Sequence, residues 1–308
     1  MSDIWRKKRI LLVGGAGTLG SDILSSHFPD FVFFVLDDFK NATLSEVDLS
    51  KICEYRKNNV ADSQAIKEVF LKFRPDVVIY LATSLSNDEN RALESNILGV
   101  KNVITEASVN NFPHLIYIQS FLTRESFEPI NEQTGKVARN SYATWKLAGE
   151  LLFSTYQGKK TTITLSSILS PLISIGAIPA FVKNIVNNQP SIINKTYRDY
   201  LNPQSFIDAL KIIIAEDLNL SEIVIGSGIE ISSEELFRQV ASGLNINSKN
   251  LNFEIVDPKP SDPERILLNS ALFQELTGWQ PKLTLELEVK KILENLKFRG
   301  DFEVRLHH

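Results

Sequence analysis

The chain has 308 residues, of which 43% are hydrophobic and 23% charged, so it can build one large or two modest folded domains. Its formal net charge of -4 gives no electrostatic basis for binding nucleic acid or an anionic membrane surface. The single cysteine excludes a disulfide framework and a thiolate metal cluster within the chain, and no metal site is predicted. Residues 1–8 lack the apolar core of a signal peptide, and prolines interrupt the longest uncharged stretch, 161–182. We therefore expect a cytoplasmic protein without a membrane span, in which residues 161–182 form a buried strand and a loop.

The first predicted strand, residues 9–13, leads into a glycine cluster and then into a helical pattern. The spacing of the cluster, G-x-x-G-x-x-G, is typical of a turn that binds a dinucleotide, although simple strand-to-helix turns also contain glycines. In such a turn the first glycine permits the bend, the second admits the pyrophosphate, and the third lets the helix pack closely. The free amides at the start of the helix face the phosphates. The cofactor contacts predicted here are Gly14, Gly17, Thr18, Leu19 and Gly20.

A carboxylate follows at the end of the next predicted strand. Phe31–Leu36 is a continuous apolar run, as expected for a strand buried on both faces of a parallel sheet, and Asp37 comes directly after it. This is about 20 residues beyond the glycines, where a dinucleotide-binding fold places the acceptor for the adenosine ribose hydroxyls. A carboxylate there repels a 2'-phosphate, so the position favours NAD over NADP. The alternative role for Asp37 is that of a turn residue at a strand end.

Strands and helices alternate through the rest of the first half. We expect an irregular polar segment at 41–59, a short strand ending at 60–62, a helix at 64–73, a strand at 77–83, a helix at 89–110 and a strand at 114–120. Asp62 either caps the helix that follows it or contacts the adenine amino group. The alternation predicts an α/β fold with a doubly wound parallel sheet.

Tyr142 and Lys146 lie one turn apart on a helix predicted for residues 141–156. A phenol has a reference pKa near 10, and a neighbouring ammonium together with a positive nicotinamide ring favours the phenolate. The alternative for this pair alone is a core aromatic beside a solvated lysine. Only His27 and His114 lie away from the end of the chain, so a histidine general base is poorly supplied.

Together with Ser120 at a strand end, these features resemble the extended short-chain dehydrogenase/reductase family, and within it the nucleotide-sugar epimerase/dehydratase group. The resemblance implies a Rossmann-type sheet with a smaller C-terminal α/β substrate-binding lobe. We assign residues 1–164 to the NAD-binding domain and 165–300 mainly to the substrate lobe, with some segments returning to the first domain. Residues 301–308 form a tail whose final histidines, His307 and His308, look like a purification tag. The segments that carry the resemblance are residues 10–20, 75–82, 96–103, 198–200, 226–236, 262–265 and 278–281.

The resemblance also implies roles for single residues. Ser120 holds the reacting sugar oxygen, Tyr142 is the acid and base, and Lys146 binds the nicotinamide ribose. Further residues that the resemblance assigns to the NAD site or to the substrate phosphates are Asp62, Leu81 and Ala82 for the cofactor, and Arg198 and Arg265 for the pyrophosphate. For each arginine alone, a surface ion pair is the alternative. Trp279 is interpreted as a packing anchor of the smaller lobe.

The sequence departs from the family pattern just after Ser120. Dehydratases of this group carry an acidic pair there, whereas this chain has Phe121 and Leu122, which cannot transfer protons. A 4,6-dehydration is therefore disfavoured. The Tyr-Gly found next in the family is replaced by Arg124 and Glu125, which predicts an unusual loop over the nicotinamide.

We therefore expect an NAD-dependent nucleotide-sugar epimerase or C4 oxidoreductase that moves a hydride at a sugar ring carbon. The alternatives are a reductase of an NDP-4-keto-6-deoxyhexose and a non-catalytic dinucleotide sensor. The resemblance implies a homodimer formed through the helices at 89–110 and 141–156.

Overall fold

The structure is a computed structural model that describes residues 7–26, 28–84, 88–247 and 251–300. The predicted tail at 301–308, with His307 and His308, lies outside the described residues, and so does His27. Contacts between residues divide the chain into two units. The first unit consists of residues 1–125, 132–165 and 207–224, and the second of residues 126–131, 166–206 and 225–308.

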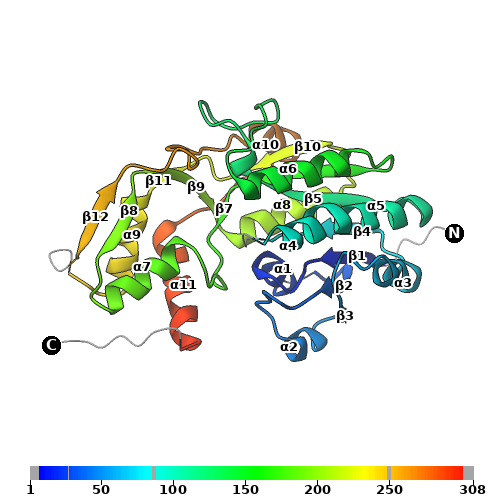
Figure 1. Ribbon diagram of the computed structural model, residues 1–308, viewed down its shortest axis with the longest axis horizontal. Coiled ribbons are helices and arrows are strands. Elements are labelled where there is room, and N and C mark those ends of the chain that lie inside the picture. Colours follow the sequence, from blue (N-terminus) through cyan, green and yellow to red (C-terminus); the bar gives the residue numbers. More distant parts are fainter. Residues whose placement is uncertain (1–6, 27, 85–87, 248–250, 301–308) are drawn as a thin grey trace. The chain divides into compact units, whose positions relative to one another are not determined.

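A seven-stranded sheet forms the centre of the first unit (Figure 1), and its strands follow the order β10-β6-β5-β4-β1-β2-β3. The strands are β1 (Lys8–Val13), β2 (Phe31–Asp37), β3 (Glu54–Lys57), β4 (Val77–Tyr80), β5 (His114–Ser120), β6 (Lys160–Leu165) and β10 (Glu222–Ile225). The neighbouring strands from β3 to β6 pair in parallel. The order 3-2-1-4-5-6 is that of a dinucleotide-binding sheet, so the predicted α/β Rossmann-type fold is confirmed.

Helices cover both faces of this sheet (Figure 1). They are α1 (Thr18–Leu24), α2 (Glu46–Ser50), α3 (Ser63–Phe73), α4 (Glu89–Leu93), the π-helical η1 (Glu94–Leu98), α5 (Gly99–Val109), the 3-10 turn η2 (Phe121–Thr123), α6 (Ser141–Ser154) and α8 (Pro203–Ala215). Leu11 and Val13 of β1 join a core cluster with apolar residues of α3, α5 and α6. The alternate residues Ile10 and Leu12 face the other way and are also fully buried. Burial on both faces explains why the central strands are continuous apolar runs.

The helix predicted over 89–110 contains a π-helical turn. It runs as α4, η1 and α5, and the Tyr80 hydroxyl of β4 donates a hydrogen bond to the Ser95 carbonyl within η1. The Ser95 hydroxyl bonds the Arg91 carbonyl one turn earlier, at 2.8 Å. Side-chain spacing alone does not distinguish one wide turn from a regular helix.

The prediction for residues 41–62 is wrong in part. The structure forms α2 and β3 within the segment predicted as irregular, and Val60 lies in a turn rather than in a strand. Because β3 is the edge strand of the sheet, its end residues Glu54 and Lys57 are exposed. An edge strand of this polar composition lacks the apolar pattern by which strands are recognised.

Within the described residues, the second unit combines two small sheets with several helices. One sheet has the order β11-β9-β7 and the other pairs β12 with β8. The elements are β7 (Ser167–Ile168), α7 (Ala177–Val186), β8 (Ser191–Asn194), β9 (Tyr197–Leu201), β11 (Glu230–Ser232), α9 (Ser233–Gly243), β12 (Phe253–Val256), α10 (Ala271–Thr277) and α11 (Leu285–Phe298). Phe181 of α7 meets Phe237 of α9 edge to face, with ring centroids 5.1 Å apart, inside their common core.

The loop predicted near residue 180 is instead the start of α7. The strand part of the prediction is confirmed by β6, but α7 begins at Ala177 with Pro179 in its first turn. A proline is tolerated there because the first amides of a helix have no intrahelical acceptor. Within the part of the chain that the structure describes, no helix combines the length and apolar character needed to cross a membrane.

Trp279 anchors the packing of the second unit, as predicted. Its side chain is buried, and its indole Nε1 donates a hydrogen bond to the Ser205 carbonyl at 3.0 Å. The ring also meets Phe273 of α10, with centroids 5.6 Å apart.

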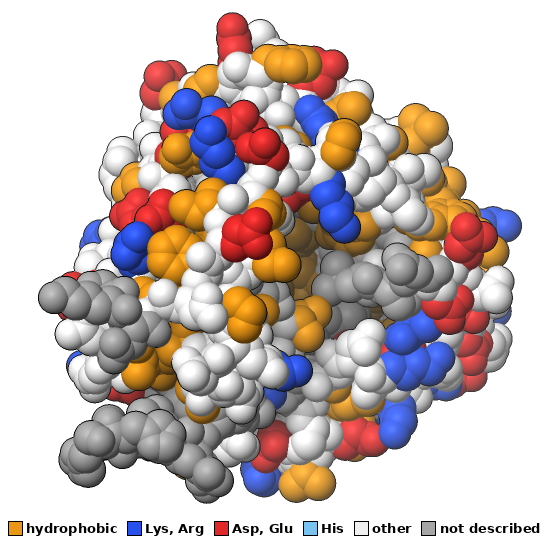
Figure 2. All heavy atoms as spheres, turned by 60° about the vertical axis from the view of Figure 1, so that its left-hand side comes forward, with side chains coloured by type: hydrophobic (Ala, Val, Ile, Leu, Met, Phe, Trp, Pro, Cys, Tyr) orange, Lys and Arg blue, Asp and Glu red, His pale blue; other side chains and the backbone are white. Residues whose placement is uncertain are grey.

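On the face shown in Figure 2, acidic and basic side chains are interspersed with hydrophobic ones.

His114 at the start of β5 makes stability depend on pH. The ring is buried, with Nε2 2.9 Å from the Thr161 hydroxyl, and burial lowers its pKa from 6.5 to about 4. In the unfolded chain His114 binds a proton near pH 6.5, whereas in the folded chain it does so only near pH 4. Stability is therefore lost as the pH falls from about 6.5 to about 4. The expected loss from this residue is roughly 2–3 kcal/mol of unfolding free energy between pH 7 and pH 4.5.

Urea unfolding of His114→Gln at both pH values tests this expectation. The variant should lose correspondingly less stability on acidification than the parent protein. Equal losses in the two proteins would assign the acid sensitivity to other groups.

Candidate active site

The glycine turn brings the carboxyl end of β1 against the segment that follows β4. Gly14 has a φ of +81°, and a Cβ on it would lie 2.6 Å from the backbone of Ala82. A Cβ on Gly20 would overlap the carbonyl of Gly15, so the third glycine packs against the turn itself. The Leu81 amide donates to the Val13 carbonyl at 2.8 Å, which places the predicted pair Leu81 and Ala82 beside the turn.

The start of α1 leaves space for an anion. Gly17 is the N-cap and supplies no side-chain cap, and Thr18, Leu19 and Gly20 form the first turn. The amides of a first helical turn have no intrahelical acceptor. The nearest atom to a Cβ on Gly17 would be the Gly14 carbonyl oxygen at 3.6 Å, so this side of the turn is open. These residues therefore fit the phosphates of a dinucleotide.

Asp37 stands at the end of β2 and is fastened to the glycine turn. One carboxylate oxygen accepts the Ala16 amide at 2.9 Å and the other accepts the Phe39 amide at 2.8 Å. Burial raises the pKa of Asp37, and these amide bonds oppose the rise. The second bond shows the turn-forming role, and the remaining lone pairs can accept ribose hydroxyls. The ribose contact stays a prediction.

Asp62, for which the sequence left two roles open, lies at the start of α3. The Asp62 carboxylate accepts the Ala65 amide at 3.0 Å and caps α3, so the capping role is shown and the adenine contact stays a prediction.

The segment around Thr43 contacts the glycine turn. The Thr43 hydroxyl lies 3.1 Å from that of Thr18, and the Thr43 amide donates a hydrogen bond to the Ala16 carbonyl. The segment around Thr43 thus covers the glycine turn, a role for which the sequence carried no recognisable pattern.

The structure brings Ser120, Tyr142 and Lys146 together. Ser120 ends β5, and its hydroxyl is hydrogen-bonded to that of Tyr142 in the first turn of α6. Asn140 caps this helix by accepting the Ala143 amide at 2.8 Å. One turn further on, the buried Lys146 Nζ donates to the Ile118 carbonyl at 2.6 Å.

Burial dominates the electrostatics of this trio. Burial raises the pKa of Tyr142, and the hydrogen bond from Ser120 lowers it by a smaller amount. Burial also lowers the pKa of Lys146 to about 7, and the Glu150 carboxylate opposes that change. The Lys146 amine lies 4.2 Å from the centre of the Tyr117 ring, whose π face favours the ammonium. Desolvation thus raises the pKa of Tyr142 in the protein alone, and the lowering expected from Lys146 together with a nicotinamide ring stays a prediction.

The side chain of Arg124 turns into the protein, and the unusual loop over the nicotinamide that it predicts stays a prediction. Only 1% of Arg124 is exposed, and the guanidinium bonds the Glu222 carboxylate and, at 3.0 Å, the Thr164 hydroxyl. Sequence analysis missed both this environment and the buried Glu150. The available sign was an acidic residue one turn beyond Lys146 on the same side of a helix.

Arg198 and Arg265 lie on neighbouring segments of the second unit. Arg198 Nη1 donates to the Glu264 carbonyl at 3.2 Å, and Nη2 pairs with Asp262 at 2.5 Å. Arg265 is exposed and pairs with Glu230. Each guanidinium thus holds a carboxylate, as the alternative interpretation expects, and contact with a pyrophosphate stays a prediction.

Asp199, between the arginine and tyrosine of the 198–200 segment, has a structural role that sequence analysis did not assign. Its buried carboxylate accepts the amides of Ser227, Gly228 and Leu268 at 2.8 to 3.2 Å. These bonds hold the Gly226–Gly228 turn in place.

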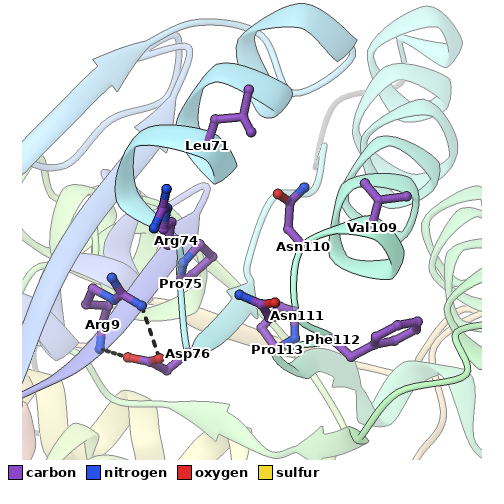
Figure 3. Close-up of a pocket in the computed structure, with 10 residues that line it drawn as sticks. All are labelled: Arg9, Leu71, Arg74, Pro75, Asp76, Val109, Asn110, Asn111, Phe112 and Pro113. Atoms are coloured by element: carbon purple, nitrogen blue, oxygen red, sulfur yellow. Dashed lines mark hydrogen bonds and ion pairs between the residues drawn. The ribbon is translucent and has the colours of Figure 1, made fainter.

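A pocket of about 350 Å³ lies at the starts of the parallel strands, where Arg9, Arg74 and Asn111 contribute to its lining (Figure 3). Arg9 fastens β1 to the start of β4, since its amide and Nη2 bond Asp76 at 2.8 and 3.3 Å. The glycine turn and Ser120 lie at the opposite, carboxyl ends of the strands, where α/β sheets bind ligands. The pocket is therefore separate from the glycine turn and Ser120.

A model of the NAD dependent epimerase/dehydratase family matches residues 10–226. The match covers more than half of the chain, which belongs to this family. The chain is therefore an enzyme of a family that uses NAD.

Individual relatives agree with this assignment. The dTDP-D-glucose 4,6-dehydratase of Bos taurus is 24% identical over 318 residues, which covers 93% of this chain and 88% of the relative. The UDP-glucose 4-epimerase of Mycolicibacterium smegmatis is 22% identical, with coverage of 93% and 97%. The crystal structure of Bordetella bronchiseptica WbmG in complex with NAD and UDP has a TM-score of 0.87 at 23% identity, with coverage of 98% and 99%. That structure has the same fold.

Proposed function

We propose that this enzyme is a nucleotide-sugar epimerase or C4 oxidoreductase in which Tyr142 is the acid and base. The observation that carries the proposal is the hydrogen bond between the hydroxyls of Ser120 and Tyr142, one helical turn from the buried Lys146 amine. A sugar hydroxyl bound at this point meets a proton acceptor and a hydrogen-bond donor simultaneously. Relatives that act on dTDP-D-glucose and UDP-glucose support a nucleotide sugar as the substrate.

In the proposed reaction the sugar loses a hydride from a ring carbon and a proton from the hydroxyl on that carbon, and each has its own acceptor. NAD, when bound, accepts the hydride from the sugar carbon. Tyr142 takes the hydroxyl proton as the carbonyl forms, while Ser120 donates a hydrogen bond to the same oxygen. The ammonium form of Lys146 stabilises the phenolate and is placed to bond the nicotinamide ribose. In an epimerase the keto sugar then turns and takes the hydride back on its other face.

The glycine turn and Asp37 would hold the cofactor. The open side of Gly17 and the first amides of α1 suit the pyrophosphate, and Asp37 suits an unphosphorylated ribose. Support for this placement comes from WbmG, whose fold is the same and which was crystallised with NAD. Arg198 and Arg265 would bind the substrate pyrophosphate through their guanidinium groups. In this structure those groups pair with the carboxylates of Asp262 and Glu230.

The residues after Ser120 favour this reaction over a 4,6-dehydration. Loss of water from the sugar needs one group that protonates the leaving hydroxyl and one that assists deprotonation. Phe121 and Leu122 form η2 at the expected places, and neither side chain transfers protons.

A panel of UDP-, GDP-, CDP- and dTDP-sugars tests the proposal, with NAD and NADP assayed in parallel. We expect nicotinamide reduction or an epimerised sugar, detected by absorbance and by NMR, and a preference for NAD. A 4-keto-6-deoxy product would instead show a dehydratase and contradict the proposal.

The proposal includes a homodimer formed through the helices that cover one face of the first unit. Helix α6 packs beside α4, η1 and α5 (Figure 1). Leu93 at the end of α4, Leu98 of η1 and Leu151 of α6 are exposed, and the Leu151 side chain is exposed to 73%. Exposed leucines on adjacent helices are typical of an interface. Light scattering should give twice the chain mass of 34.7 kDa, and Leu151→Glu should lower it towards the monomer. A monomer at micromolar concentration would contradict this part of the proposal.

A further inference from the structure

A buried charged network is centred on helix α6, two turns beyond Tyr142, and the proposed chemistry does not use it. At its centre is Glu150, whose carboxylate lies 2.8 Å from Lys136 Nζ and 3.7 Å from Arg124 Nη2. Arg124 also bonds Glu222 of β10. Both Arg124 and Glu150 are almost completely withdrawn from solvent, which is costly for charged groups unless they are paired.

Gln119 connects this network to the catalytic residues on both sides. Its Nε2 donates to the Glu150 carboxylate at 2.8 Å and to the Lys146 carbonyl at 3.3 Å. Its Oε1 accepts the amide of Ser120 at 2.9 Å. One amide side chain therefore ties the end of β5 to the turn of α6 that carries Lys146.

We propose that Gln119 and Glu150 are positioning residues, which fix Ser120 relative to Lys146 and use the Glu150 charge to keep the Lys146 amine protonated. This inference rests on the proposed function, because it assigns the network to the same reaction. Arg124 and Lys136 balance part of the Glu150 charge, so the net field at Lys146 is set by the whole network.

Several ionisable groups surround Lys146, and Glu150 is the carboxylate among them that favours the ammonium. The other groups are Tyr142 on α6, Tyr117 on β5, Tyr80 of β4 stacked on Tyr117, and Arg124, Lys136 and Glu222 around Glu150. The helix η1 also packs against α6, and its Glu94 side chain accepts a hydrogen bond from Asn59. Tyr80 and Tyr117 are neutral near pH 7, since a phenol has a reference pKa near 10 and burial raises the pKa of both.

Two variants should shift the titration of Lys146 in opposite directions. Glu150→Gln keeps the size of the side chain but removes its charge, so the Lys146 pKa should fall by about one unit. Lys136→Met removes a half-exposed cation that balances Glu150, so the Lys146 pKa should rise. Opposite shifts distinguish an electrostatic role from a loss of packing, which would impair both variants alike. Glu54→Gln, which removes an exposed carboxylate paired with Lys72, is the matched control and should change nothing.

The experiment is an NMR titration of the full-length protein with 13C-labelled lysine, which reports the Lys146 pKa without any turnover. In parallel, kcat for sugar oxidation should fall about fivefold at pH 7 in Glu150→Gln with KM little changed, because a lower Lys146 pKa leaves less of the amine protonated. The alkaline limb of its pH profile should move to lower pH. In Lys136→Met the alkaline limb should move to higher pH. Lys136 is a surface residue, so this variant keeps the test open if Glu150→Gln does not fold.

An unchanged Lys146 titration in both variants, or shifts of the same sign, would overturn the inference. Failure of the proposed function looks different, because it is an absence of oxidation and epimerisation in the parent protein on the whole sugar panel. The NMR result would stand in that case.

Discussion

Tyr142→Phe is expected to lower kcat roughly a thousandfold, because the variant keeps the aromatic ring but loses the hydroxyl that we propose takes the sugar proton beside Ser120. Removing a proton acceptor from the reacting oxygen affects the transition state more than substrate binding. KM for the nucleotide sugar should therefore change by less than about tenfold. Stopped-flow absorbance of the nicotinamide measures the hydride step directly.

Tyr156→Phe provides the matched control. The Tyr156 hydroxyl is buried and donates to the Pro113 carbonyl at 2.8 Å, in the segment that precedes β5. Its loss should cost about 1 kcal/mol of unfolding free energy and leave kcat unchanged. If Tyr142→Phe turned over like the parent protein, the assignment of the acid and base would be wrong.

Gly14→Ala and Gly17→Ala should separate folding from cofactor binding. The Gly14 Cβ would sit 2.6 Å from the Ala82 backbone at a φ of +81°, so the variant combines a clash with backbone strain. Its unfolding free energy should fall by about 3 kcal/mol or more, as measured by urea unfolding without added nucleotide.

Gly17→Ala meets no such clash, because its nearest neighbour would be 3.6 Å away. Its stability should stay within about 1 kcal/mol of the parent protein. Its NAD affinity, measured by calorimetry, should nevertheless fall at least roughly tenfold, because the methyl group fills the side on which the pyrophosphate approaches. Parental affinity in Gly17→Ala would place the phosphates elsewhere.

The central sheet was predictable because burial on both faces leaves a simple trace in the sequence. Phe31–Leu36 and His114–Ser120 are apolar runs, and each forms a strand of the parallel sheet. The edge strand Glu54–Lys57 has no such trace, since one of its edges meets solvent and its composition is polar. The wide turn at Glu94–Leu98 was equally invisible, because it depends on a hydrogen bond from a distant strand.

The shared helix face of Tyr142 and Lys146 was predictable from their spacing, but the electrostatics of the two side chains were not. Tyr142 and Lys146 share a helix face at any burial, whereas their pKa values depend on how much water the folded protein excludes. Arg124 shows the same limit, because its partners Thr164 and Glu222 are 40 and 98 residues away in the chain. Such contacts exist only after the sheet has formed.

The return of the chain to its first unit has a consequence for biosynthesis. The strand β10 joins the sheet beside β6, and the Thr162 amide bonds the Ser221 carbonyl next to it. A ribosome therefore delivers six of the seven strands before residue 166, but the last one only after residues 166–221 have emerged, of which 166–206 belong to the other unit. During that interval the nascent sheet carries an open hydrogen-bonding edge at β6, the kind of surface that chaperones shield and that aggregates otherwise recruit.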